Sequence, residues 1–138
     1  MTFGSVRHSR RIAAPADRVW ALAGDPARLH EWFPGIVTCV VEGASRTITL
    51  ASGLTLPEEI LVHDDVSRRF QYRVTTEFFR YHRGTLDVVD LGDGTCLVSY
   101  AVDADPRTMA LVIAGAAAAG LDALAALMET PTADEGSA

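Results

Sequence analysis

The chain has 138 residues, which is enough for one domain with a single hydrophobic core. Hydrophobic residues make up 49% of it and charged residues 22%, a globular composition that excludes general disorder. The formal net charge is −6, and the sequence shows no basic face of the kind that nucleic-acid binding requires.

The N-terminal part is predicted to form one strand followed by two short helices. Val6–Ile12 alternates as a strand does. Pro15 then precedes a helix over Ala16–Ala23, because proline suits the first helical turn. Asp25-Pro26 repeats the start signal, with aspartate as the N-cap, and predicts a second short helix that runs to about Trp32.

The middle of the chain is predicted to be a run of six strands. Between Ile36 and Asp103 the hydrophobic pattern has a period of two, and clusters of turn residues divide it. Consecutive strands joined by short turns form an antiparallel meander. The predicted strands are Ile36–Glu42, Arg46–Leu50, Leu54–His63, Arg69–Thr75, Tyr81–Val89 and Thr95–Asp103.

Asp105-Pro106 begins a long predicted helix, Arg107–Met128, the only element large and apolar enough to cover a face of the sheet. Its alanine- and glycine-rich middle carries little side-chain volume. This middle therefore either packs closely on the sheet or leaves a void. We expect a partial void near Ala116–Ala119, because the inner face of the sheet is bulky and curved.

The same segment is long enough to span a bilayer. Asp122 interrupts it, however, and alanine and glycine drive insertion only weakly. The start of the chain has no apolar stretch typical of a secretory signal. These features favour a buried helix in a soluble, cytoplasmic protein without stable membrane insertion. Residues 1–129 are expected to form the domain and residues 130–138 a flexible tail.

Two motifs stand out in the first part of the chain. The first, V-x-x-S-x-x-I-x-A-P-A-D-x-V-W, runs from Val6 to Trp20, and the second is Trp32-Phe33-Pro34-Gly35. Together with the order of the elements, they resemble the START/Bet v 1-like (SRPBCC) superfamily. The bacterial polyketide cyclase/dehydrase branch is the most similar, and the resemblance covers nearly the whole chain. It implies an α+β helix-grip fold, in which a curved seven-stranded antiparallel sheet, two short helices and a long C-terminal helix enclose a ligand cavity.

Alternation along each strand decides which side chains face the helix. In Leu54–His63 the even-numbered residues are the more apolar, so Glu58 and Val62 are expected inside. Glu59 and His63 are then expected outside. The same test places His82 on the inner face of its own strand.

The turn positions also predict a register. Glu58 is expected opposite Val74, and Val74 opposite His82, so that the three residues form one row across the sheet. Two strand spacings, roughly 10 Å, would separate Glu58 from His82 at the backbone. Side chains can close such a gap to a water or a substrate atom. A single β-bulge would break the row and move side chains to the other face.

Glu58 and His82 are the candidate catalytic residues. A carboxylate on an apolar face costs several kcal/mol unless it is paired or protonated. Glu58 is therefore either a general base or ligand acceptor, or it pairs with an arginine or lies near the rim in water. His82 is either an acid/base group or a donor to a ligand carbonyl, or it is a satisfied group of the core or rim.

Aromatic and small residues complete the expected ligand-binding set. Tyr72 and Tyr100 either offer phenol donors to a ligand or fill the core with their hydroxyls at the rim. Trp32 and Phe33 either gate the cavity mouth or pack the second helix on the sheet. The other expected lining residues are Leu56, Ile60, Phe70, Val74, Leu86, Val98, Met109, Ile113, Ala116 and Ala117.

Several other chemistries are not predicted. Cys39 and Cys96 lie in apolar runs without metal-type spacing, so neither a disulfide framework nor a metal site is expected. The sequence also lacks a Ser-His-Asp order and a dinucleotide-binding glycine pattern. The arginine pairs Arg68-Arg69 and Arg80/Arg83 are expected to be solvated charges near loops.

The sequence favours a protein that binds a small hydrophobic, polyketide- or lipid-like molecule, with cyclase/dehydratase activity as an extension. In that extension Glu58 removes a proton next to a ketone, and His82 or a tyrosine hydroxyl stabilises the enolate oxygen or protonates a leaving hydroxyl. Proton transfer of this kind needs no cofactor. The alternatives are a lipid carrier or sensor and an interaction module such as a toxin–antitoxin component. Homodimerisation through the outer face of the sheet is left open.

Overall fold

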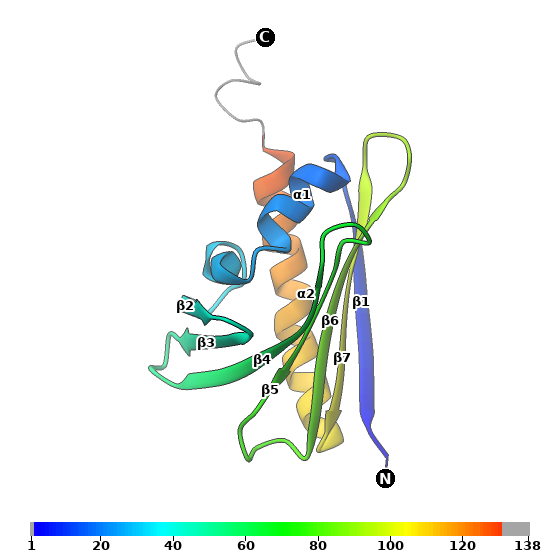
Figure 1. The fold of residues 1–138 in the computed structure, drawn as a ribbon. Helices are drawn as coiled ribbons and strands as arrows, with labels where there is room; N and C mark the ends of the chain where they lie inside the picture. Colours follow the sequence, from blue (N-terminus) through cyan, green and yellow to red (C-terminus); the bar gives the residue numbers. More distant parts are fainter. Residues whose placement is uncertain (1, 131–138) are drawn as a thin grey trace.

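A seven-stranded antiparallel sheet curves around the C-terminal helix in the computed structural model, which describes residues 2–130 (Figure 1). The strand order is β1-β7-β6-β5-β4-β3-β2, so β2 to β7 form the predicted meander and β1 closes against β7. The α+β helix-grip fold is therefore confirmed. The strands are β1 (Gly4–Ile12), β2 (Ile36–Glu42), β3 (Ser45–Leu50), β4 (Thr55–Asp64), β5 (Arg69–Val74), β6 (Tyr81–Asp90) and β7 (Cys96–Asp105).

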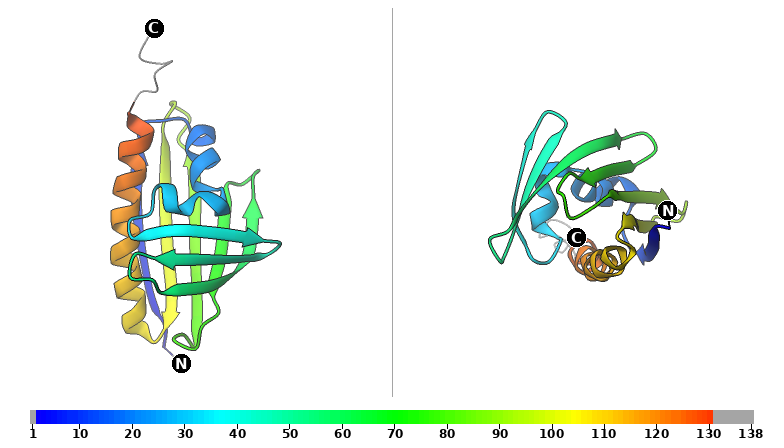
Figure 2. Two further views of the ribbon diagram at one scale, coloured as in Figure 1. Left: turned by 90° about the vertical axis from the view of Figure 1, so that its left-hand side faces the viewer. Right: turned by 90° about the horizontal axis from the view of Figure 1, so that it is seen from below.

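Two short helices, α1 (Ala16–Ala23) and η1 (Pro26–Glu31), connect β1 to β2. The second is a 3₁₀ helix, and it begins as predicted, because the Asp25 side chain accepts a hydrogen bond from the Ala27 backbone N–H at 3.0 Å. Figure 2 shows the strands curving from β1, beside the C-terminal helix, round to β2 and β3.

The C-terminal helix α2 (Arg107–Glu129) packs mainly on β1 and β7. Its length of 23 residues and mean hydropathy of 2.0 would suffice to cross a membrane, although in this structure it covers β1 and β7. Only 33% of its most apolar window is buried inside the structure, less than the predicted buried helix implies. Leu111 and Val112 are each 66% exposed. The expected C-terminal tail lies, beyond Thr130, outside the described residues.

A β-bulge in β4 changes the predicted faces of that strand. Ile60 pairs with Tyr72 on β5 but Val62 pairs with Gln71, so one residue of β4 is left over between them. Beyond the bulge, Val62 therefore lies on the outer face and His63 on the inner face beside Phe70, the reverse of the prediction. Before the bulge, the predicted faces are correct.

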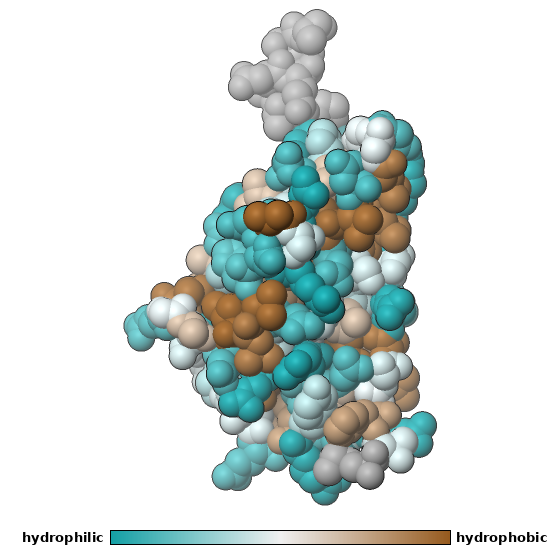
Figure 3. All heavy atoms as spheres, turned by 45° about the vertical axis from the view of Figure 1, so that its right-hand side comes forward, coloured by the Kyte–Doolittle hydropathy of each residue, from teal (hydrophilic) through white to brown (hydrophobic). Residues whose placement is uncertain are grey.

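The surface is mixed in character. On the face shown in Figure 3, hydrophobic residues form separate groups that hydrophilic residues divide. Apolar atoms make up a large share of the surface of folded domains, so groups of this kind are expected.

Gly84 of β6 lets Tyr72 of β5 lie directly on the sheet backbone. A Cβ atom at position 84 would lie 2.5 Å from two carbons of the Tyr72 ring. The ring cannot shift easily, because its hydroxyl is hydrogen-bonded at 2.5 Å to the buried hydroxyl of Tyr100. The close approach therefore requires glycine at this position.

Gly84→Ala should lower the free energy of unfolding by about 1–3 kcal/mol, because the added methyl group overpacks the core. Gly115→Ala is the matched control: it lies in an exposed turn of α2 with nothing within 4 Å of the new Cβ. The control should be stabilised by up to about 1 kcal/mol, because alanine favours helix. Urea denaturation measures both. Equal stability of the two variants would contradict the packing of Tyr72 on Gly84.

Candidate functional site

Four residues from neighbouring strands form one row on the inner face of the sheet. Arg46 of β3 pairs with Glu58 of β4, and Glu58 pairs with Val74 of β5. His82 of β6 follows, because its Nδ1 accepts a hydrogen bond from the Val74 backbone N–H at 3.0 Å. The predicted row of Glu58, Val74 and His82 is therefore present, and Arg46 extends it.

Glu58 forms a buried ion pair. Arg46 donates from Nε to Glu58 Oε1 at 2.7 Å, and the two side chains are only 3% and 2% exposed. The Arg46 guanidinium also lies 5.1 Å from the centre of the Phe70 ring and 5.0 Å from that of Tyr72. Arg46 donates further to the Pro26 backbone carbonyl at 3.3 Å. Of the alternatives left open for Glu58, pairing with an arginine is the one present.

Burial and pairing act in opposite directions on the pKa of Glu58. Burial raises this pKa above its ordinary value, and the Arg46 guanidinium partly offsets the rise. Burial acts to lower the pKa of Arg46, but the charge of Glu58, the hydrogen bond to it and the two neighbouring tyrosine hydroxyls together outweigh this effect, so the pKa is raised and Arg46 stays protonated. Removing either partner leaves the other as an unpaired group in the core.

His82 is a neutral hydrogen-bond donor. Burial lowers its pKa to about 4, against the opposing charge of Asp103, so the ring is uncharged at neutral pH. Because Nδ1 accepts from a backbone N–H, the proton of the neutral ring sits on Nε2. Nε2 is buried and has no hydrogen-bond partner within residues 2–130. His82 thus offers one unused N–H group.

The hydroxyls of Tyr72 and Tyr100 are hydrogen-bonded to each other. The two oxygens lie 2.5 Å apart in the core. Burial raises the pKa of Tyr72 well above its ordinary value and that of Tyr100 to about 12. Neither hydroxyl lies at the rim, in contrast to the expectation for core-filling tyrosines. Tyr100 packs in the core beside the cavity, whereas Tyr72 also lines it.

An apolar cavity of about 290 Å³ lies above the row, between the sheet and α2. Its walls come from β2 to β6, from the turn after η1 and from the first half of α2. Glu58, Tyr72 and His82 are its polar side chains. The complete lining is Phe33, Pro34, Gly35, Ile36, Ile48, Leu50, Leu56, Glu58, Tyr72, Val74, His82, Val112, Ile113 and Ala116.

The cavity brings together about half of the residues expected from the sequence. Both candidate catalytic residues line it. Of the expected ligand-binding residues, Phe33, Leu56, Tyr72, Val74, Ile113 and Ala116 line it, whereas Trp32, Ile60, Phe70, Leu86, Val98, Tyr100, Met109 and Ala117 do not. Most of this second group is buried in the core below the cavity or beside it.

The void lies earlier along α2 than predicted. It borders Val112, Ile113 and Ala116, whereas Ala117 is fully buried. A Cβ atom at Gly120 would lie 3.1 Å from the Phe33 ring and 3.3 Å from the Trp32 ring. The thin part of α2 is therefore filled by aromatic residues of the loop, and the cavity opens one turn before it.

Arg46 is the main residue that sequence reasoning missed. Arg46, Ile48 and Leu50 alternate along β3, and the last two are apolar residues that line the cavity. The same alternation test used for β4 places Arg46 on the inner face. An arginine and a glutamate on one inner face would then have indicated the pair.

Comparison with known proteins shows the family. A sequence model described as "Polyketide cyclase / dehydrase and lipid transport" matches residues 4–129. The chain therefore belongs to this family, within the START/Bet v 1-like (SRPBCC) superfamily, whose members are associated with small hydrophobic ligands. No curated protein sequence matches the chain.

Solved structures share the fold at low identity. XoxI from Bacillus cereus has a TM-score of 0.84 at 22% identity, covering 91% of this chain and 95% of that one. Norcoclaurine synthase from Thalictrum flavum, in complex with dopamine and hydroxybenzaldehyde, has a TM-score of 0.72 at 20% identity, with 95% and 90% coverage. A START superfamily protein from Mycobacterium smegmatis has a TM-score of 0.73 at 13% identity, with 89% and 97% coverage.

The part of the chain that the structure describes also bears on metal ligation. Between residues 2 and 130, no group of three or more His, Cys, Asp and Glu side chains lies together as metal ligands do.

Arg46→Met should lower the free energy of unfolding by about 3–5 kcal/mol, because Glu58 is left unpaired in the core. Glu58→Leu should lower the free energy of unfolding by a similar amount, because Arg46 is then unpaired. The double variant Arg46→Met/Glu58→Leu should recover most of the loss, because two apolar side chains replace the pair. Urea denaturation of all four proteins gives the coupling energy. Simple addition of the two losses would contradict the ion pair.

The stability conferred by His82 should depend on pH. The histidine pKa is 6.5 in the unfolded chain and about 4 in the folded protein, so between these values the unfolded state binds more protons. His82 therefore costs no stability above pH 6.5 and progressively more as the pH falls towards 4. His82→Asn keeps an acceptor for Val74 N–H but does not titrate.

The stability difference between wild type and His82→Asn should shift by roughly 2–3 kcal/mol in favour of the variant from pH 7 to pH 4. Denaturant unfolding at several pH values measures this difference. A difference that stays constant with pH would mean that the histidine is charged or exposed in the folded state.

Proposed function

We propose that this protein binds a small hydrophobic, polyketide- or lipid-like molecule that carries a carbonyl or hydroxyl oxygen, in the cavity between the sheet and α2. The observation that carries the proposal is the apolar cavity of about 290 Å³ with Glu58 and His82 in its wall. This volume is close to the lower end of the roughly 300–1,000 Å³ usual for small-molecule sites. The family description, polyketide cyclase/dehydrase and lipid transport, supports the same ligand class.

His82 determines which polar group the ligand needs. Its Nε2–H is buried, neutral and unpartnered within residues 2–130, so it suits an oxygen that accepts a hydrogen bond. Glu58 is held by Arg46 through Oε1 and adds a charged acceptor in the same wall. A ligand with a carbonyl near a hydroxyl or an acidic C–H would satisfy both residues.

A second candidate function is cofactor-free cyclisation or dehydration. It is favoured by the raised pKa of Glu58, which makes this carboxylate a stronger base than a solvated one. Glu58 would remove a proton next to a ketone, and His82 Nε2–H would stabilise the enolate oxygen. Protonation of a leaving hydroxyl by His82 is disfavoured, because its pKa of about 4 leaves no imidazolium at neutral pH.

The remaining readings are carriage of the ligand without reaction, sensing, and service as a protein-interaction module. Norcoclaurine synthase, solved with dopamine and hydroxybenzaldehyde, supports a small oxygen-bearing ligand in a protein of this fold. The free thiols of Cys39 and Cys96 support the proposed cytoplasmic location, because thiols stay reduced there.

Binding is tested with N-phenyl-1-naphthylamine, a neutral dye that fluoresces in apolar sites. Ala116→Phe should weaken its binding by about tenfold or more, because a phenyl group fills the mouth of the cavity. Ala126→Phe is the matched control on an exposed part of the same helix away from the cavity. Equal binding by the two variants, or no binding by the wild type, would refute the proposal.

A second experiment distinguishes carriage of the ligand from catalysis. Native mass spectrometry of protein from its source identifies any bound molecule, which is then incubated with wild type and with Glu58→Gln. Conversion that is lost in Glu58→Gln while binding is retained supports the cyclase/dehydratase function. A molecule that wild type binds and returns unchanged supports carriage.

A further inference from the structure

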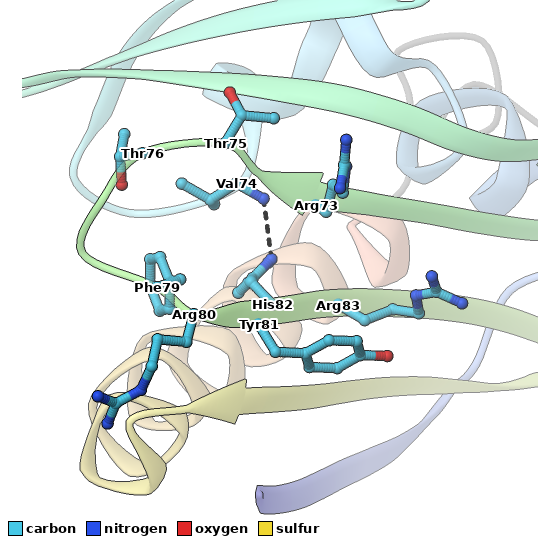
Figure 4. A pocket seen from close by; sticks show the side chains of 9 residues that line it. All are labelled: Arg73, Val74, Thr75, Thr76, Phe79, Arg80, Tyr81, His82 and Arg83. Carbon is cyan, nitrogen blue, oxygen red and sulfur yellow. Dashed lines mark hydrogen bonds between the residues drawn. The ribbon is translucent and has the colours of Figure 1, made fainter.

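A second cavity, of about 260 Å³, opens where β5 and β6 separate. The last paired residues of the two strands are Tyr72 and Gly84, although β5 continues to Val74 and β6 begins at Tyr81. The strand ends therefore splay, and the cleft between them is bridged by the hydrogen bond from Val74 to His82 (Figure 4). Its lining is Arg73, Val74, Thr75, Thr76, Phe79, Arg80, Tyr81, His82 and Arg83.

The cleft gathers polar atoms that lack partners. Four side-chain polar atoms within residues 2–130 are buried without a hydrogen bond, and three of them belong to residues that line this cleft: Thr76 Oγ1, His82 Nε2 and Arg83 Nε. Such atoms are rare in native proteins, and each needs a partner, which is ordered water or a ligand. Figure 4 shows Thr76 and Arg83 towards opposite ends of the cleft, with His82 between them.

All three unpartnered atoms can donate a hydrogen bond. Arg83 Nε can only donate, and His82 Nε2 carries the ring proton because Nδ1 accepts from Val74. The Thr76 hydroxyl can donate as well. A ligand of this cleft would therefore present hydrogen-bond acceptors to it.

The charges around the cleft point to an anion. Arg73 forms an ion pair with Glu59 at 2.6 Å, and Arg80 forms one with Asp105 at 3.2 Å. Arg83 has no ion pair within residues 2–130, and its guanidinium lies 6.0 Å from the centre of the Tyr81 ring.

Arg83 was expected to be a solvated loop charge, but its Nε is buried. Continuing the register from Tyr72 and Gly84 places Arg83 opposite Arg73 on the outer face, where two like charges repel. Asp103 lies opposite Arg83 on β7, but no ion pair joins the two within residues 2–130, and the Asp103 carboxylate accepts a hydrogen bond from the Ser5 hydroxyl at 2.5 Å. An anion beside Arg83 would add the direct ion pair that this arginine lacks within the described residues.

The cleft adjoins the apolar cavity. Val74 and His82 line both, so these two side chains form the partition between them. A molecule whose apolar part fills the inner cavity and whose polar end passes His82 would place that end in the cleft.

We propose that the cleft between β5 and β6 is a second site, which binds an oxyanion, a carboxylate or a phosphate, beside Arg83 and His82. The oxyanion is either free or the acidic end of the molecule held in the inner cavity, and this second form rests on the proposed function. The protein then selects acidic amphiphiles over neutral ones of the same length.

The test uses decanoate and 1-decanol as competitors of N-phenyl-1-naphthylamine, because they have the same chain length and differ in the charged end. Wild type should bind decanoate about tenfold more tightly than decanol, as a charge-assisted hydrogen bond predicts. Arg83→Gln should reduce this preference to about twofold or less while leaving decanol binding unchanged. Arg7→Gln, which removes an equal charge from an exposed position on β1, is the control and should keep the preference.

Inorganic phosphate tests the free anion. Phosphate should raise the melting temperature of wild type and of Arg7→Gln but not that of Arg83→Gln. A phosphate effect without a decanoate preference means that the site binds a free anion. A decanoate preference without a phosphate effect means that the site binds the acidic end of an amphiphile. Equal binding of decanoate and decanol together with no phosphate effect overturns the proposal. A loss of the decanoate preference in Arg7→Gln equal to that in Arg83→Gln also overturns it.

Two further outcomes also have a defined interpretation. If the dye does not bind but phosphate acts through Arg83, the proposed function fails and the oxyanion site stands. If Arg83→Gln does not fold, Arg83→Lys replaces it, because lysine keeps the charge but lacks the Nε–H donor. The decanoate preference should then fall by about threefold, and an unchanged preference overturns the role of Arg83.

Discussion

The buried pair of Arg46 and Glu58 is the interaction on which the rest of the inner face depends. Two charges removed from water cost several kcal/mol each, and only close geometry with further hydrogen bonds offsets that cost. Here Glu58 is held at 2.7 Å, and Arg46 also meets the Pro26 carbonyl and the faces of Phe70 and Tyr72. The pair thereby joins β3, β4 and β5 to η1, and it keeps a charged carboxylate in the wall of an apolar cavity.

The cavity itself follows from a mismatch between the sheet and α2. Close packing is the rule in protein interiors, so an opening of about 290 Å³ needs a structural cause. The sheet curves away from the helix while the side chains of α2 become small towards Gly120. Trp32 and Phe33 fill the part nearest Gly120, and the first half of the helix remains separated from β3 and β4. The aromatic loop thus decides where the cavity ends along α2.

His82 connects the two cavities because the β5–β6 ladder ends early. Its ring replaces a backbone acceptor for Val74 N–H, and this single hydrogen bond sets the tautomer that leaves Nε2–H unused. On one side the ring meets an apolar space and on the other a cleft with three arginines. A histidine that is neutral at physiological pH suits this position, since burial removes the water that a charged ring would need.

The sequence by itself determined the order of the elements, the antiparallel meander and the inward direction of Glu58 and His82, because alternation and turn residues are local signals. It also predicted that Glu58 lies opposite Val74, because the hairpin turns set the register. Only the tertiary structure decided the partner of Glu58, the faces of Val62 and His63, and the position of the void along α2. Arg46 reaches Glu58 through pairing of β3 with β4, the faces depend on a bulge without a sequence signature, and the void depends on which loop residues meet Gly120.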